Sequence, residues 1–237
     1  MTMIKAILFD FGQTLVDSAD GFRRAEKEAQ DKLFKDLSLT LEEKFLENYR
    51  RIRKQFHERS DFSRKSIWNE VYYYHCLTAD PDLLEKWESE YWDTVKANTK
   101  LFPEAQKVLE ALNSLYAVAL ITNTQGQKRD GTHRISQFPE LDKYFKAVIV
   151  AGEGGIPPKP DPKPFQMCLE ELGIDPIEAV YVGDDFRIDI CGAQDAGLQA
   201  IWIKHRLVLR NWPDVETEVP IISSLDELLD LEKLFSH

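Results

Sequence analysis

Little in this sequence supports a disulfide framework or a zinc site. The chain of 237 residues has only three cysteines, Cys76, Cys168 and Cys191. They are odd in number and widely separated, and they form neither a CxxC pair nor a cysteine–histidine spacing of the kind that binds zinc. We therefore expect all three to be reduced thiols buried in the protein interior.

The sequence also lacks long apolar runs and basic clusters. No segment approaches the roughly 20 apolar residues that a membrane-spanning helix needs. The short apolar run near the N-terminus leads directly to Asp10, which does not fit a signal peptide. The formal net charge is −11 and no stretch is dense in Lys or Arg, which disfavours nucleic acid as a partner. These features predict a soluble, cytoplasmic protein that binds neither nucleic acid nor membrane. Its oligomeric state, a monomer or a homodimer, is left open.

What the chain does contain is an alternation of strand-like and helical patterns. Continuous apolar runs, typical of strands covered on both faces, occur at 4–9, 116–122, 147–151, 179–182, 200–203 and, more weakly, 219–222. Helical patterns lie between them at 104–115, 164–172 and 188–196, and Gly173 and Gly197 are the expected C-caps of the last two. This order predicts an α/β fold: a Rossmann-like, doubly wound parallel sheet with right-handed crossovers.

Residues 19–97 interrupt this alternation. The stretch has no strand-like run and carries four amphipathic helical patterns, the second of which follows a capping box made by Thr40 and Glu43. Its many aromatic residues are expected to pack inside a small bundle. We therefore predict two domains, a Rossmann-like core of residues 1–18 and 98–237 and an inserted α-helical bundle of residues 19–97.

Polar residues follow four of the predicted strands, at the edge where an open parallel sheet binds ligands. They are Asp10 after the first strand, Thr122 and Asn123 at the second, Lys159 beyond the third, and Asp184 and Asp189 after the fourth. Each residue alone has an ordinary explanation, such as a turn, a helix cap or a solvated loop. Together they offer an attacking carboxylate, donors for phosphate oxygens, a fixed cation and carboxylates for a metal. This set suits phosphoryl transfer, which depends mainly on positioning and electrostatic stabilisation.

The strings FDFGQTL, ITN, KPDPKPF and YVGDDFRIDICGAQDAGL resemble, in order and spacing, the four motifs of the haloacid dehalogenase superfamily. The resemblance covers nearly the whole chain. The inserted helices resemble the cap of the subgroup whose cap follows the first motif, which includes phosphoglycolate-type and sugar-phosphate phosphatases, phosphonatases and haloacid dehalogenases. The resemblance implies a Mg²⁺-dependent hydrolase, most often a phosphatase, whose partner is a small phosphorylated metabolite.

The resemblance also implies a role for each matching residue. Asp10 resembles the nucleophile that forms an aspartyl-phosphate intermediate, and Thr122 resembles the hydroxyl that binds the transferring phosphoryl group. Asn123 is expected to bind substrate. Lys159 resembles the lysine that neutralises charge around nucleophile and phosphate. The implied Mg²⁺ ligands are Asp10, the backbone carbonyl of Gly12, Asp184 and Asp189, with Asp189 in the coordination shell or just behind it; hard oxygen ligands suit this ion.

Gly12 departs from the family pattern. Family phosphatases usually carry a second Asp at this position, which protonates the leaving group and then activates water. Such a group typically contributes about 10²–10⁴-fold to the rate, and Gly12 has no side chain to replace it. Three alternatives follow: a phosphatase that tolerates the loss, a phosphonatase- or dehalogenase-like C–X bond hydrolase, or a catalytically impaired member that binds a phosphorylated ligand or a protein.

The first alternative is favoured, because the metal and phosphate residues are retained together. Dehalogenases need no metal, and their fourth motif lacks the acidic pair that this chain keeps as Asp184 and Asp189. Phosphonatases need a cap lysine, and none of the lysines of the insertion stands in an identifiable motif.

The sequence leaves the substrate undefined. Polar side chains of the insertion are either solvated helix faces or substrate contacts; they include Arg23, Arg24, His57, Arg64, Lys65 and His75. The segment Thr124–Pro139 is either a loop near the site or a surface connection.

Overall fold

The computed structural model describes residues 3–124 and 134–235. The chain divides into two compact units, each of which is described by itself. The first consists of the described residues up to Ala19, of Lys100–Thr124, and of those from residue 134 onward; the second is Asp20–Thr99. Of the segment Thr124–Pro139, residues 125–133 lie outside the described residues. That the second unit works as a cap remains a prediction.

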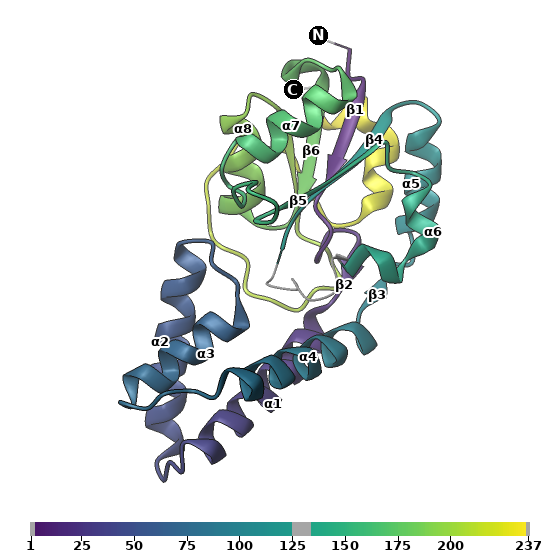
Figure 1. Cartoon of the computed structure of the whole chain (residues 1–237). Coiled ribbons are helices and arrows are strands. Elements are labelled where there is room, and N and C mark those ends of the chain that lie inside the picture. Colours follow the sequence, from purple (N-terminus) through teal and green to yellow (C-terminus); the bar gives the residue numbers. More distant parts are fainter. Residues whose placement is uncertain (1–2, 125–133, 236–237) are drawn as a thin grey trace. The chain divides into compact units, whose positions relative to one another are not determined.

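The first unit is built on a six-stranded sheet in the order β5-β4-β1-β6-β7-β8, with every neighbouring pair parallel. Figure 1 labels four of these strands, β1, β4, β5 and β6. The strands are β1 (Ala6–Phe9), β4 (Ala117–Asn123), β5 (Ala147–Ala151), β6 (Ala179–Gly183), β7 (Gln199–Ile203) and β8 (Ile221–Ile222). The predicted α/β fold is confirmed, with a strand in each predicted range. A separate antiparallel pair, β2 (Val16–Asp17) and β3 (Lys100–Leu101), was not predicted, because two residues carry no periodic pattern.

Both faces of the central strands of this sheet are buried, which explains their continuous apolar runs. In β1, Ile7 and Phe9 join one apolar cluster and Ala6 and Leu8 join another, and all four are inaccessible to solvent. The first cluster is covered by α5 (Ala105–Asn113), α6 (Pro139–Asp142), η4 (Leu225–Asp230) and α9 (Leu231–Leu234). The second is covered by α7 (Lys163–Leu172), η3 (Phe186–Cys191) and α8 (Gly192–Asp195). Short 3-10 turns, η1 (Arg134–Gln137) and η2 (Pro176–Glu178), complete the unit.

The helix predicted over 188–196 differs in the structure. The helical segment starts earlier, as the π-helical turn η3, and continues into α8. The cause is Asp185, whose carboxylate accepts a hydrogen bond from the backbone N–H of Ile188 (2.9 Å) and so begins the helical segment at Phe186. The C-cap of α7 is as predicted: Gly173 lies in the left-handed region with φ +66°.

The second unit contains α1 (Ala19–Asp36), α2 (Glu42–Glu58), α3 (Arg64–Tyr74) and α4 (Pro81–Ala97). Their apolar stripes meet in one core that includes Leu33, Tyr49, Trp68 and Val95. The capping box predicted at Thr40 is wrong. Helix α2 begins at Glu42 with Leu41 as its N-cap, without a side-chain hydrogen bond, which leaves Thr40 outside the helix.

The aromatic residues of this unit are mostly buried, as expected. Trp68, Trp87, Tyr91 and Trp92 belong to its core, whereas Tyr73 is 75% exposed on the outer face of α3. None of the helices in the described residues is long and apolar enough to cross a membrane.

The expectation of three buried thiols is only partly correct. All three cysteines are free; Cys168 is buried and Cys191 is half-buried, but Cys76 is exposed. Cys76 lies in the turn after α3 with φ +58°, beyond the apolar stripe that would have buried it.

Candidate active site

Strands β1, β4 and β6 lie side by side, so their carboxyl ends meet at one edge of the sheet. Asp10 immediately follows β1, and its N–H donates to the carbonyl of Val182 at 2.9 Å. Asp184 immediately follows β6. The topology therefore places the first and fourth sequence motifs next to each other, as predicted from their strand positions.

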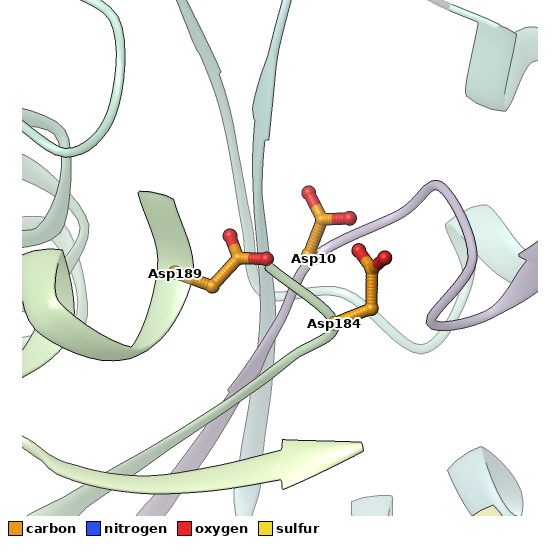
Figure 2. A group of neighbouring side chains, drawn as sticks. All are labelled: Asp10, Asp184 and Asp189. Carbon is orange, nitrogen blue, oxygen red and sulfur yellow. The ribbon is translucent and has the colours of Figure 1, made fainter. Parts of the chain in front are cut away.

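Three carboxylates gather at this edge. One carboxylate oxygen from each of Asp10, Asp184 and Asp189 lies within 4.8 Å of the others, and the three residues are only 9%, 6% and 1% exposed. Figure 2 shows Asp10 and Asp184 on the chain just beyond their strands, while Asp189 projects from the helical turn η3. Three buried acids this close together are costly unless cations compensate their charge.

Lys159 supplies one such cation. Its side chain is 1% exposed, and its Nζ lies 2.8 Å from Oδ1 of Asp10 and 2.7 Å from Oδ1 of Asp189. The same Nζ contacts the hydroxyl of Tyr181 at 2.7 Å and the carbonyl of Ile121 at 3.0 Å. An ammonium group has three protons, so four neighbouring oxygens saturate it. Lys159 is therefore fixed between two of the acids.

Asn123 fixes the main chain that carries this lysine. Its Nδ2 donates to the carbonyl of Lys159 at 3.1 Å, and its Oδ1 accepts from the N–H of Lys159 at 2.8 Å. The structure thus gives Asn123 a positioning contact. Its predicted contact with substrate remains a prediction.

Asp189 is held by backbone as well as by Lys159. Its Oδ2 accepts from the N–H of Asp185 at 2.9 Å. Gly183 makes this approach possible, because a Cβ built at position 183 would lie 2.4 Å from the Cβ of Asp189. Both oxygens of Asp189 are engaged by protein donors, which favours a place just behind the metal's coordination shell.

Asp184 has a different cation. Its Oδ2 lies 2.5 Å from Nη1 of Arg210, and its main-chain carbonyl accepts from the indole Nε1 of Trp202 at 3.0 Å. Arg210 belongs to the irregular segment between β7 and β8.

The electrostatics follow from this arrangement. Burial raises the pKa of Asp10 to about 6; Lys159 opposes the shift and Asp189 adds to it. Burial also raises the pKa of Asp184 well above its ordinary value, against the opposing effect of Arg210. Burial alone would lower the pKa of Lys159, but Asp10 and Asp189 outweigh it and raise that pKa to about 12. Three carboxyl groups thus face two cations, and ionisation of all three would leave an excess of negative charge.

This donor set fits the implied magnesium ion. Carboxylate oxygens are hard ligands of the kind that Mg²⁺ prefers, and the raised pKa values of Asp10 and Asp184 show that a further positive charge would stabilise their ionised forms.

The remaining predicted residues lie at the same edge of the sheet. Thr122 is 2% exposed and is the last residue but one of β4, paired in register with Val150 of β5. Gly12 lies in the turn between β1 and β2, where it forms an isolated bridge with Val16. The roles of the Thr122 hydroxyl and the Gly12 carbonyl remain predictions.

A family profile described as haloacid dehalogenase-like hydrolase matches residues 4–197, most of the chain. The chain belongs to this family of hydrolases. The glyceraldehyde 3-phosphate phosphatase of Pyrococcus abyssi is 30% identical over 208 residues, which cover 86% of this chain and 82% of the relative.

Two solved structures also resemble this hydrolase along almost its whole length. A HAD phosphatase from Thermococcus onnurineus has 26% identity and a TM-score of 0.68, with 97% of this chain and 98% of the other covered. A 2-haloacid dehalogenase from Pseudomonas syringae pv. Tomato has 26% identity and a TM-score of 0.66, with 99% and 100% covered. Similarity of fold therefore does not by itself distinguish phosphate-ester hydrolysis from dehalogenation.

Three residues of the hydrolase's site were missed at the sequence level. They are Tyr181, Trp202 and Arg210. Tyr181 offered a weak signal, since its hydroxyl interrupts an otherwise apolar strand next to the fourth motif. Arg210 offered none, because it lies in a stretch without helical or strand periodicity.

The helical unit of the hydrolase contains a cavity of about 660 Å³. Of the polar residues considered from the sequence, Arg23, His57 and Arg64 line it, together with Glu26. Arg64 is 5% exposed, so it is not a solvated helix-face residue. Lys65 pairs with Glu85 at 2.6 Å and with Glu88 at 3.1 Å. Arg24 and His75 are not among the lining residues.

Proposed function

We propose that this hydrolase is a Mg²⁺-dependent phosphatase of small phosphorylated metabolites, with Asp10 as its nucleophile. One observation supports the proposal above all. Asp10, at the end of the first strand, pairs with the buried Lys159 and gathers with two further buried carboxylates. The phosphatase names of the relatives point to the same class of substrate.

In the proposed reaction, a carboxylate oxygen of Asp10 attacks the phosphorus of a monoester and the bond to the leaving oxygen breaks. The aspartyl phosphate is then hydrolysed by water, which returns the carboxylate and releases phosphate. Lys159 holds Asp10 in position and offsets the charge of the incoming phosphate, and the hydroxyl of Thr122 would bind the transferring group.

Magnesium would be held by Asp10, Asp184 and the carbonyl of Gly12, with Asp189 behind them. When bound, it would supply positive charge that favours ionised Asp10 and a nearby phosphate. This charge matters because the pKa of Asp10 is raised to about 6.

Gly12 determines which half of the reaction is limiting. Without a carboxylate at this position, the leaving group must take its proton from water, and the attacking water lacks a dedicated base. We therefore expect kcat/KM, which reports formation of the aspartyl phosphate, to favour phosphorylated substrates with good leaving groups. Release of the intermediate is the slow step in this proposal.

The dehalogenase alternative is the second candidate, and the similarity to the Pseudomonas syringae enzyme is the observation that favours it. The acidic cluster argues against it, since Asp184 and Asp189 have no evident use in a reaction without a metal. Halide release from a 2-haloacid would identify this alternative.

The deciding experiment compares the natural chain with Gly12→Asp on a panel of phosphate esters with Mg²⁺. We expect the variant to turn over phosphate esters about 10²-fold faster or more, in the range that general acid–base catalysis supplies. Gln13→Asp is the matched control. It places the same carboxylate one residue away, where φ is +61°, a conformation that Asp tolerates, and it should give no gain.

Mass spectrometry of the intact protein tests the intermediate directly. Phosphate trapped on Asp10 in the natural chain, released faster in Gly12→Asp, is the expected result. No turnover in either protein, with no phosphate on Asp10, would refute the phosphatase proposal.

A further inference from the structure

Arg210 makes a short polar contact with the acidic cluster. Its Nη1 lies 2.5 Å from Oδ2 of Asp184, whose side chain is 8% exposed, whereas that of Arg210 is 33% exposed. The two residues are 26 positions apart. The contact therefore brings a solvent-accessible segment onto one of the three carboxylates of Figure 2.

The guanidinium is supported by two tryptophans. Its central carbon lies 4.3 Å from the ring centroid of Trp212, an ordinary cation–π distance. Trp212 packs edge-on against Trp202, with ring centroids 6.5 Å apart and planes at 83°. Trp202 in turn donates its indole N–H to the carbonyl of Asp184. Asp184 is thus held at its carboxylate by Arg210 and at its main chain by Trp202, the residue against which Trp212 packs.

The charges show why this contact matters. Lys159 contacts Asp10 and Asp189, and the ion pair of Asp184 is with Arg210. The guanidinium therefore engages Oδ2 of Asp184, one of the two oxygens through which this carboxylate could bind a divalent cation. A cation bound at Asp184 and a guanidinium at the same oxygen repel each other at close range.

We propose that Arg210 is a built-in counter-ion of Asp184 that competes with the metal and so sets the affinity of the site for Mg²⁺. Without the metal, Arg210 holds the Asp184 carboxylate in place. In this proposal the guanidinium moves away from Oδ2 when the metal binds, because the two positive charges repel, and the exposed third of its side chain gives it a route to solvent. This inference rests on the proposed metal site.

Calorimetric titration of Mg²⁺ into the full-length protein, stripped with a chelator, tests this role without relying on activity. We expect Arg210→Gln to bind Mg²⁺ about tenfold more tightly than the natural chain, which is the effect of losing a competing ion pair worth about 1.4 kcal/mol. Arg206→Gln is the matched control. It removes the same charge from an exposed position on the same segment, and it should change the affinity less than twofold.

Thermal unfolding gives a second readout. The chelator-treated Arg210→Gln protein should unfold at a lower temperature than the natural chain. Saturating Mg²⁺ should raise the unfolding temperature of Arg210→Gln by more than it raises that of the natural chain. If Arg210→Gln fails to fold, Arg210→Lys serves instead. A lysine keeps the charge but loses the planar fork of the guanidinium. The Mg²⁺ affinity of Arg210→Lys should therefore lie between that of the natural chain and the tenfold higher affinity expected for Arg210→Gln.

The outcomes separate the two proposals. Unchanged or weaker Mg²⁺ binding in Arg210→Gln would overturn the counter-ion role, as would a raised KM with unchanged metal affinity, which would make Arg210 a substrate contact. Failure of every protein to bind Mg²⁺ would instead refute the proposed metal site.

Discussion

Asn123 and Lys159 are joined by a pair of hydrogen bonds that run in opposite directions between one side chain and one main chain. The amide Nδ2 donates to the Lys159 carbonyl at 3.1 Å, and Oδ1 accepts from the Lys159 N–H at 2.8 Å. The end of β4 is thereby tied to the segment that carries the catalytic lysine candidate. The position of Nζ beside Asp10 depends on this connection.

Replacing Asn123 by Ala should therefore disturb Lys159. Two buried main-chain groups would lose their partners, each at a cost of about 1–3 kcal/mol in the free energy of unfolding. Asn123→Asp is the graded control, because its carboxylate still accepts from the Lys159 N–H but cannot donate to the carbonyl. Hydrogen exchange at the Lys159 amide should accelerate strongly in Asn123→Ala and much less in Asn123→Asp. Equal protection in all three proteins would contradict the positioning role.

Asp10 should reduce the stability of the metal-free protein at neutral pH. Its pKa is raised from 3.8 to about 6, so between these pH values the folded protein binds more protons than the unfolded chain. The stability that this raised pKa contributes to the folded protein is fully present below about pH 3.8 and is lost as the pH rises through about 6. Asp10→Asn removes the ionised form and should stabilise the chelator-treated protein by up to roughly 3 kcal/mol at about pH 8.

Urea unfolding at two pH values checks this prediction. The gain of Asp10→Asn should disappear near pH 4, where Asp10 of the natural chain is protonated. The exposed Asp195→Asn should show no gain at either pH. Turnover of phosphate esters should be lost in Asp10→Asn alone. A variant that is less stable than the natural chain at about pH 8 would contradict the prediction.

Glu26 of the helical unit should stabilise the protein at neutral pH, the opposite of the effect expected for Asp10. This buried carboxylate accepts from the Tyr91 hydroxyl at 3.1 Å and pairs with Arg53 at 3.0 Å. Burial would raise its pKa, but Arg64 and Arg53 outweigh burial and lower it. Its contribution to stability is therefore present above the ordinary value of 4.5 and is lost as the pH falls through the lowered value.

Glu26→Gln should then destabilise the protein near neutral pH, because Arg64 would remain buried without its carboxylate. We expect a loss of about 3 kcal/mol in the free energy of unfolding, which shrinks toward acidic pH. Glu28→Gln on the same helix, where the side chain is exposed, should change stability by less than about 0.5 kcal/mol. Chemical unfolding followed by circular dichroism measures both. A pH-independent loss in Glu26→Gln would show that packing, not charge, holds this residue.

The sequence predicted the sheet well because both faces of its central strands are covered, which produces unbroken apolar runs with few alternative explanations. It also placed Asp10, Lys159, Asp184 and Asp189 together, since the carboxyl ends of parallel strands meet at one edge. It could not predict the contacts that orient these groups. The hydrogen bonds of Asn123 and the ion pair of Arg210 depend on how irregular segments return to the sheet, and such segments carry no periodic pattern.

Gly183 tests how tightly the acidic cluster is packed. A Cβ at this position would lie 2.4 Å from the Cβ and 2.5 Å from the Cγ of Asp189. Asp189 cannot easily withdraw, because its two oxygens are held by Lys159 at 2.7 Å and by the N–H of Asp185 at 2.9 Å. Gly183→Ala should therefore force the helical turn η3 away from β6, at a cost of about 3 kcal/mol.

Gly154→Ala is the matched control for this substitution. A Cβ there meets nothing within 4 Å, and the only strain comes from φ of +58°, worth about 1 kcal/mol. Urea unfolding of both variants should show the larger loss at Gly183, and calorimetry should show weaker Mg²⁺ binding for that variant alone, since the displaced Asp189 no longer faces Asp10. Similar losses at both glycines, with unchanged Mg²⁺ binding, would mean that the backbone beside Asp184 yields without moving Asp189. The cluster would then be looser than the distances around Asp189 indicate.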